Sequence, residues 1–183
     1  MSDLTVVIPT IARCTLQRSI ESLQNQTVQD WNAILVYDGV EPTLHFDDRR
    51  FTILRTEKLG SPSSAGLVRN VGIQRATTDW VGFLDDDDVL TEIYVEVFLK
   101  YKNFCDAMVM TMAMPAGGFI PHNYEMGIAE GNVGISFCYN KKKFPVMFEK
   151  SRVEDFRFLS SLQRAGARIM LLKEVGYKAL GAR

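Results

Sequence analysis

Four consecutive aspartates, at positions 85 to 88, are the residues of this sequence best suited to chemistry. They directly follow the apolar run WVGFL, which is typical of a buried strand. At a separation of about 4 Å and an effective dielectric constant near 20, each like-charge pair costs roughly 4 kcal/mol. A divalent cation would offset this repulsion. We therefore predict a Mg²⁺ or Mn²⁺ site at Asp85 and Asp87, whose side chains point the same way along an extended chain.

The aspartates have three other interpretations. A solvated acidic turn is one alternative, with Asp88 near the cap of the following helix. An EF-hand loop is excluded, because its sixth position would be Leu90 instead of glycine. The spacing Asp-x-Asp-x-Val also resembles the nucleophile motif of haloacid-dehalogenase-type phosphatases, although that motif normally ends the first strand. Because Mg²⁺ usually fills its coordination shell with water and substrate phosphates, the metal interpretation also predicts a phosphate-bearing ligand.

A second acidic pair, Glu154 and Asp155, lies in the late stretch SRVEDFRFLSSLQRAG. Ser151 and Glu154 form the Ser-x-x-Glu pattern of a capping box, which predicts a structural role for Glu154. Asp155 shares one helix face with apolar residues three, four and seven positions later: Phe158, Leu159 and Leu162. A carboxylate on that face is either buried with partners or opens into a cleft, and the helix dipole would favour its ionised form.

The elements that must position these acids follow from the apolar pattern. Continuous apolar runs rich in β-branched residues predict strands buried on both faces, at 4–9, 33–37, 51–54, 80–84, 107–112, 133–140 and 168–172. Helical spacing predicts helices around 16–23, 65–76, 91–102 and 153–165. This alternation indicates one α/β domain over 1–183, with a doubly wound, mostly parallel (mixed) sheet and helices on both faces. The Gly- and Pro-rich segment 115–131 predicts a long flexible loop.

Bulk composition excludes several function classes. The 183 residues suit one domain, and a formal net charge of −1 favours neither nucleic acid nor acidic lipid as a partner. The three cysteines are far apart and lack metal-ligand spacing, which indicates reduced thiols in a cytoplasmic protein. The start MSDLTVVIPT does not resemble a signal peptide, and no stretch is long enough to span a bilayer. Peripheral attachment to a membrane surface stays an open alternative.

Four segments carry a resemblance to a known family. TVVIPT, SIESLQNQTVQDWNAILVYDG, GLVRNVGIQRATTDWVGFLDDDD and VEDFRFLSSLQRAG occur in this order and at familiar spacing. Together they resemble the family 2 glycosyltransferases, which have the GT-A fold. The resemblance covers most of the chain and is weakest over 103–150. It implies inverting transfer of a sugar, of the hexosyltransferase type, from a nucleotide-diphosphate sugar to a hydroxyl acceptor. UDP-sugars are the favoured sugar donors, and polysaccharide biosynthesis is the implied context, with a glycan or lipid-linked glycan as acceptor.

The resemblance also implies roles for residues of the nucleotide-binding half, 1–102. Pro9 and Thr10 match the segment beside the donor's base. Asp38 matches the second acid of the family's Asp-Asp-Gly motif and would contact the base or ribose, whereas Tyr37 replaces the first acid. Arg69 matches the arginine that faces the nucleotide. Plain structural roles, as turn residues for Thr10 and Asp38 and as a solvent-facing helix residue for Arg69, are the alternatives.

The metal site and the base are assigned by the same resemblance. Asp87 would ligate the metal, and Asp85 and Asp86 would face the ribose or water on the metal. Asp155, in the acceptor-side half 103–183, would be the general base. The tail LLKEVGYKALGAR lacks the histidine that many relatives use as a further metal ligand.

The chain is also short for this family. Its acceptor region would be minimal, supplied by a partner, or completed by a second subunit in a homo-oligomer. A non-catalytic domain that binds nucleotide sugars is therefore a third hypothesis, beside the glycosyltransferase and the phosphatase.

Overall fold

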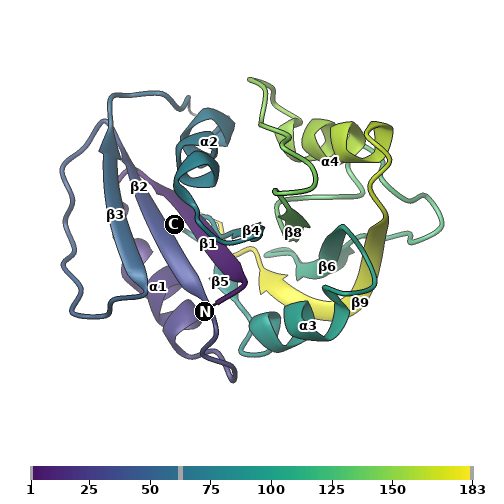
Figure 1. Ribbon diagram of the computed structural model, residues 1–183, viewed down its shortest axis with the longest axis horizontal. Helices are drawn as coiled ribbons and strands as arrows, with labels where there is room; N and C mark the ends of the chain where they lie inside the picture. Colours follow the sequence, from purple (N-terminus) through teal and green to yellow (C-terminus); the bar gives the residue numbers. More distant parts are fainter. Residues whose placement is uncertain (1, 62–63, 182–183) are drawn as a thin grey trace.

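A single mixed sheet runs through the computed structural model, which describes residues 2–61 and 64–181 (Figure 1). Within these residues the elements are, in chain order, β1 (Leu4–Thr10), α1 (Leu16–Gln24), β2 (Asn32–Asp38), β3 (Phe51–Thr56), α2 (Gly66–Arg75), β4 (Trp80–Phe83), β5 (Val89–Leu90), α3 (Tyr94–Tyr101), β6 (Ala107–Ala113), β7 (Phe119–Ile120), β8 (Phe137–Asn140), α4 (Glu154–Arg164) and β9 (Ile169–Lys178).

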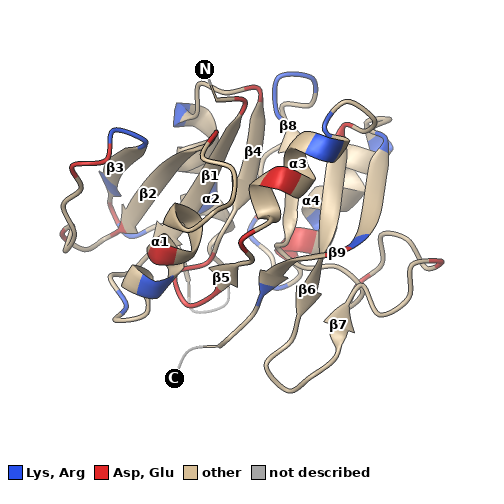
Figure 2. Ribbon diagram, turned by 90° about the horizontal axis from the view of Figure 1, so that it is seen from below, with Lys and Arg blue, Asp and Glu red and all other residues tan. Residues whose placement is uncertain are grey.

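The sheet has a parallel half and a mixed half. Its strand order is β3-β2-β1-β4-β8-β6-β9-β5, and β7 pairs with β6 at the side. The first four strands are parallel, β8 runs antiparallel to β4 and β6, and β9 returns parallel to β6. Figures 1 and 2 place α1 and α3 on one face of the sheet and α2 and α4 on the other. The predicted α/β class, with a mostly parallel mixed sheet and helices on both faces, is confirmed.

Helix α2 packs closely on β1, beside the edge of the sheet where the acids lie. All seven residues of β1 are buried, as the continuous apolar run predicts for a central parallel strand. A Cβ atom at Gly72 would lie only 2.4 Å from Cγ1 of Val7, so only glycine allows α2 to approach this closely. The N-terminus of α2 is thereby held beside the carboxyl ends of β1 and β4.

The structure differs from the predicted elements mainly in the mixed half. The two-residue strands β5 and β7 were not predicted, because two residues carry no readable period. β9 continues to Lys178, well past the predicted end at 172, and β8 begins at Phe137 instead of 133. The predicted long loop is present, but it is organised around Asn132, which is fully buried. The Asn132 amide accepts from the N–H groups of His122 and Asn123 and donates to the carbonyls of Asn123 and Gly127.

The cysteines are free thiols, with Cys14 exposed and Cys105 and Cys138 buried. Among the described residues, no helix combines the length and the apolar character that crossing a membrane requires. The cytoplasmic location expected from the sequence stays a prediction.

Candidate active site

A cavity of about 560 Å³ lies at the carboxyl ends of β1, β2 and β4, beside the N-termini of α2 and α4. Ligands of open α/β sheets bind at this edge, because the strand ends leave a crevice there. The cavity is lined by every residue that the sequence nominated: Pro9, Thr10, Asp38, Arg69, Asp85, Asp86, Asp87 and Asp155. The structure therefore brings together acids that are up to 117 positions apart in the sequence (38 to 155).

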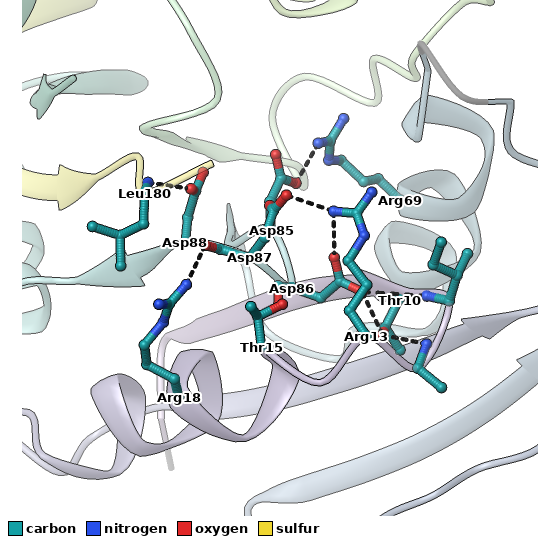
Figure 3. A network of polar contacts seen from close by, with 12 residues as sticks. Thr10, Arg13, Thr15, Arg18, Arg69, Asp85, Asp86, Asp87, Asp88 and Leu180 are labelled. Atoms are coloured by element: carbon teal, nitrogen blue, oxygen red, sulfur yellow. Dashed lines mark hydrogen bonds and ion pairs between the residues drawn. The ribbon is translucent and has the colours of Figure 1, made fainter. Parts of the chain in front are cut away.

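Asp86 ties the aspartate loop to the segment after β1. Its side chain is buried and accepts hydrogen bonds from Oγ1 of Thr10 at 2.7 Å and from the N–H of Ile11 at 3.3 Å. Its backbone carbonyl accepts from Oγ1 of Thr15 at 2.7 Å (Figure 3). Thr10 and Asp86 therefore fix the geometry of the cavity floor as well as lining it.

Asp85 and Asp87 are the two carboxylates of the predicted metal site, and each is paired with an arginine. Oδ1 of Asp85 lies 2.5 Å from Nη2 of Arg69, and Oδ2 of Asp87 lies 2.6 Å from Nη1 of Arg13. Burial raises the pKa of Asp87, with Asp85 and Asp86 adding to the rise and Arg13 opposing it. The loop thus holds more negative charge than its arginines neutralise.

A divalent cation fits this set of oxygen ligands. Within the described part of the chain, no group of three or more His, Cys, Asp or Glu side chains forms a ready-made metal cage. Mg²⁺ commonly takes only one or two carboxylates and completes its shell with water and substrate phosphates. Asp85 and Asp87 meet that requirement, because both face a cavity large enough for a phosphate-bearing ligand.

Asp88 has a different role from its three neighbours. It accepts hydrogen bonds from the hydroxyl of Tyr177 at 2.9 Å and from the N–H of Leu180 at 2.8 Å. The same tyrosine hydroxyl accepts from the N–H of Asp85 at 3.1 Å. Burial raises the pKa of Asp88 to about 6. The alternative that Asp88 caps the next helix is wrong, because α3 begins after Ile93 and has no side-chain cap; Asp88 instead anchors the end of β9.

Glu154 is the main residue of the site that sequence reasoning assigned wrongly. Its carboxylate accepts from the N–H groups of Ala65 at 3.1 Å and Gly66 at 3.0 Å, so it caps α2 instead of its own helix. It also lies 2.5 Å from Nη1 of Arg69. The predicted capping box with Ser151 does not form, because α4 begins at Glu154 with Val153 at its N-cap, which leaves Ser151 outside the capping position.

Arg69 is the buried cation of the cavity. It is 3% exposed, and its two terminal nitrogens are taken by Glu154 and Asp85. Although burial opposes the charge, the surrounding carboxylates Asp85, Asp155 and Glu154 raise the pKa of Arg69. The alternative that Arg69 faces solvent is therefore wrong.

Asp155 is left without a comparable partner. Its Oδ1 atom is buried and, among the described residues, has no hydrogen-bond partner. Burial raises the pKa of Asp155 to about 7; Arg69 opposes the rise, and Asp85 and Glu154 add to it. The expected stabilisation of the ionised form by the helix dipole is outweighed. A carboxyl group that titrates near neutral pH and lines a cavity is suited to proton transfer.

Asp38 lines the cavity where β2 ends and Gly39 turns the chain with a φ of 73°. It accepts from the N–H groups of Leu59 at 2.6 Å and Gly60 at 3.1 Å and from Nζ of Lys58 at 2.6 Å. Burial opposes ionisation of Asp38, but these hydrogen bonds lower its pKa overall. Asp38 is thus both a turn residue and part of the cavity wall.

Three charged residues of the cavity wall escaped the sequence analysis: Arg13, Lys58 and Arg152. Arg13 follows the end of the same strand as Thr10, so the rule that ligands bind at strand ends could have found it. Lys58 and Arg152 lie in loops, and nothing in their local sequence indicates that they reach the cavity.

Comparison with known proteins identifies relatives of this chain. The model of the family "Glycosyl transferase family 2" matches residues 5–158. A poly(ribitol-phosphate) β-N-acetylglucosaminyltransferase, TarP of Staphylococcus aureus, is 31% identical over 166 residues, which cover 84% of this chain and 51% of that protein. The chain spans 20%, 26% and 42% of the lengths of three further curated relatives.

Solved structures show the same fold at low sequence identity. S. aureus TarS 1–349 in complex with UDP-GlcNAc matches 100% of this chain and 59% of that chain, with a TM-score of 0.75 and 17% identity. The mannosyltransferase PcManGT from Pyrobaculum calidifontis, in complex with GDP-Man and Mn²⁺, matches 99% of this chain and 58% of that chain, with a TM-score of 0.73 and 12% identity. The predicted GT-A type of fold is confirmed.

Proposed function

Because the chain belongs to glycosyl transferase family 2, we propose that it transfers a hexose, with inversion, from a nucleotide-diphosphate sugar to a hydroxyl acceptor. The observation that carries the proposal is the placement of Asp155, with its unpaired Oδ1, in the cavity that Asp85 and Asp87 also line. The family match favours this function over the haloacid-dehalogenase alternative.

The sugar donor would lie along the cavity from Asp38 toward Asp155. Pro9, Thr10 and Asp38 would border the base and ribose, where hydrogen-bonding groups and a fixed turn supply a shaped wall. Arg69, Asp85 and Asp86 would border the ribose and diphosphate. UDP-sugars are the favoured donors; the TarS structure with UDP-GlcNAc supports a nucleotide sugar as the ligand class.

Asp85 and Asp87 would hold a Mn²⁺ or Mg²⁺ ion. When bound, such an ion supplies positive charge to the diphosphate leaving group. The family relationship and the Mn²⁺ in the PcManGT structure support this cofactor. The excess negative charge around Asp87 supports it from within this chain.

Asp155 would act as the general base. It would take the proton of the acceptor hydroxyl while that oxygen attacks the anomeric carbon from the side opposite the diphosphate. The new carbon–oxygen bond forms as the bond to the diphosphate breaks, which inverts the anomeric centre. The proton ends on Asp155, and the nucleoside diphosphate leaves with the bonding electrons.

The acceptor is expected to be a glycan or a lipid-linked glycan, approached from the mixed half of the sheet. The loop around Asn132 would shape this side, and a second copy of the chain or another partner would complete it. A domain that binds the sugar donor without catalysing transfer is the second candidate function, since the chain spans only part of its relatives.

Calorimetric titration with UDP and with GDP, each with and without Mn²⁺, tests the proposal. We expect Mn²⁺-dependent binding of one nucleotide to the wild type and its loss in Asp87→Ala. Asp79→Ala is the matched control, because Asp79 is an aspartate paired with Lys142 outside the cavity wall. Absence of binding for both nucleotides would contradict the donor site. Binding without slow, Asp155-dependent hydrolysis of the matching nucleotide sugar would favour the non-catalytic alternative.

A further inference from the structure

We propose that Arg13 is an internal counter-cation that keeps a divalent cation off the aspartate loop until a nucleotide diphosphate binds. This inference rests on the proposed function and names how metal binding at the same site is controlled. Arg13 would occupy the carboxylate of Asp87 in the empty site and give it up when metal and diphosphate arrive together.

The contacts of Arg13 place it in competition with a metal ion. Its Nη1 atom lies 2.6 Å from Oδ2 of Asp87 and 3.1 Å from Oδ1 of Asp86, so one nitrogen bridges two carboxylates (Figure 3). A divalent cation at Asp87 would need lone pairs of the same carboxylate. Because a guanidinium and a metal ion are both cations, they would also repel each other if both stayed.

Arg13 is less firmly held than Arg69. The Arg13 side chain is 39% exposed, whereas that of Arg69 is 4% exposed. The side-chain hydrogen bonds of Arg13 to described residues come from Nη1 alone, whereas Arg69 uses both terminal nitrogens. Because the guanidinium of Arg13 is open to water and uses one nitrogen, it can turn into solvent more readily than the enclosed guanidinium of Arg69. The cavity thus contains one fixed cation and one exchangeable cation.

The charges explain why metal alone would compete poorly. Without a ligand, Arg13 already neutralises part of the charge of Asp86 and Asp87. A metal ion that arrives alone gains these carboxylates only by displacing Arg13. A metal ion that arrives with a diphosphate also gains phosphate oxygens as ligands, and the added negative charge leaves room for both cations. Metal and nucleotide should therefore bind with positive coupling, and Arg13 should enlarge that coupling.

The test is the affinity for Mn²⁺ alone, measured by electron paramagnetic resonance of free Mn²⁺. We expect Arg13→Ala and Arg13→Gln to bind Mn²⁺ about tenfold more tightly than the wild type in the absence of nucleotide. Arg18→Ala is the matched control: Arg18 donates to the backbone carbonyl of Asp87 at 2.8 Å, so its loss removes the same charge nearby without freeing a carboxylate. It should change Mn²⁺ affinity by less than twofold.

A parallel titration of Mn²⁺ in the presence of UDP or GDP separates this inference from the proposed function. The ratio of Mn²⁺ affinities with and without nucleotide should fall in Arg13→Ala. Nucleotide-dependent Mn²⁺ binding by the wild type, combined with unchanged Mn²⁺ affinity in both Arg13 variants, would overturn the role of Arg13 alone. Equal gains in Arg13→Ala and Arg18→Ala would overturn it too, because only general electrostatics would then be at work. Absence of Mn²⁺ binding in the wild type and the variants, with either nucleotide, would overturn both.

Discussion

Two carboxylates of the cavity wall, Asp38 and Asp155, are in opposite states. Asp38, at the end of β2, accepts three hydrogen bonds from its own chain, and its pKa is lowered. Asp155, at the start of α4, has a buried oxygen without a partner among the described residues, and its pKa is raised to about 7. Asp38 is therefore held charged and fixed, whereas Asp155 is suited to exchange a proton near neutral pH.

Burial is the largest cause of this difference, and Glu154 contributes to it. The terminal nitrogens of Arg69 bind Glu154 and Asp85. Burial raises the pKa of Asp155; the charge of Arg69 opposes the rise without a hydrogen bond, and Asp85 and Glu154 add to it. Because Glu154 and Asp85 bind the terminal nitrogens of Arg69, Asp155 stays available to exchange a proton.

Replacing each of these two acids should separate chemistry from binding, and Asp155→Asn should give the largest effect. Loss of a general base costs about 10²–10⁴ in rate, so we expect kcat for sugar transfer to fall roughly 10³-fold. Affinity for the nucleotide should stay within about twofold, because the proposed nucleotide contacts lie elsewhere. Radiolabel transfer assays and calorimetry measure the two quantities. A kcat above one tenth of the wild-type value would contradict the base assignment.

Glu154→Gln should lower the pKa of Asp155, so that Asp155 resembles Asp38 more closely. Removing one partner of a buried ion pair costs about 3 kcal/mol, so the midpoint of urea unfolding should fall clearly. The freed nitrogen of Arg69 should turn to Asp155 and lower its pKa, which moves the pH profile of transfer to lower pH. Glu149→Gln is the control, because Glu149 is an exposed glutamate near the same helix. Wild-type stability together with an unmoved profile would contradict this account of Glu154.

Asp38→Ala should affect binding much more than chemistry. Hydrogen bonds to charged groups contribute about 1.5–3 kcal/mol, and this substitution also releases the turn at Leu59 and Gly60. We expect the affinity for the nucleotide to fall about 20-fold and kcat at saturating sugar donor to fall less than threefold. Isothermal calorimetry and saturation kinetics report the two values. A larger loss in kcat than in affinity would contradict the distinction between Asp38 and Asp155.

Strand ends were sufficient to predict that Asp38 and the aspartate cluster meet, because the carboxyl ends of neighbouring parallel strands share one edge of the sheet. Thr10, Arg69 and the role of Asp155 were predicted from the family resemblance instead. The four consecutive aspartates also indicate a cation site, because their like charges repel one another. This argument needs no knowledge of distant contacts.

The partners of these residues could not be predicted, because partner choice depends on contacts between distant segments. Glu154 has a perfect local capping pattern but binds an arginine 85 positions away. The helix dipole was expected to favour the ionised form of Asp155, but burial raises the pKa of Asp155 instead. The short strands β5 and β7 depend on pairing with β9 and β6, and two-residue strands leave no pattern to detect.

The pH dependence of sugar transfer should also distinguish Asp155 from Asp38, with a smaller effect than the substitutions above. Asp155 must be deprotonated to act as a base, so kcat/KM should rise with pH and level off above about 7. At pH 6 the rate should be about one tenth of the plateau, since one pH unit below the pKa leaves about a tenth of the base ionised. The Asp155→Asn variant should lose this inflection, and Asp38→Asn should keep it.

The same raised pKa predicts that folding stability changes in the opposite direction. The folded state retains the proton of Asp155 up to about pH 7, whereas the unfolded chain releases it near pH 4. The contribution of Asp155 to stability therefore declines as pH rises between these values, and Asp155→Asn should remove that decline in urea unfolding measured from pH 5 to pH 8. Asp88, with a pKa of about 6, adds its own decline, so Asp88→Asn is the necessary second variant. If the activity inflection vanished in Asp88→Asn and persisted in Asp155→Asn, the titrating group would be the anchor of β9 and the proposed base would be wrong.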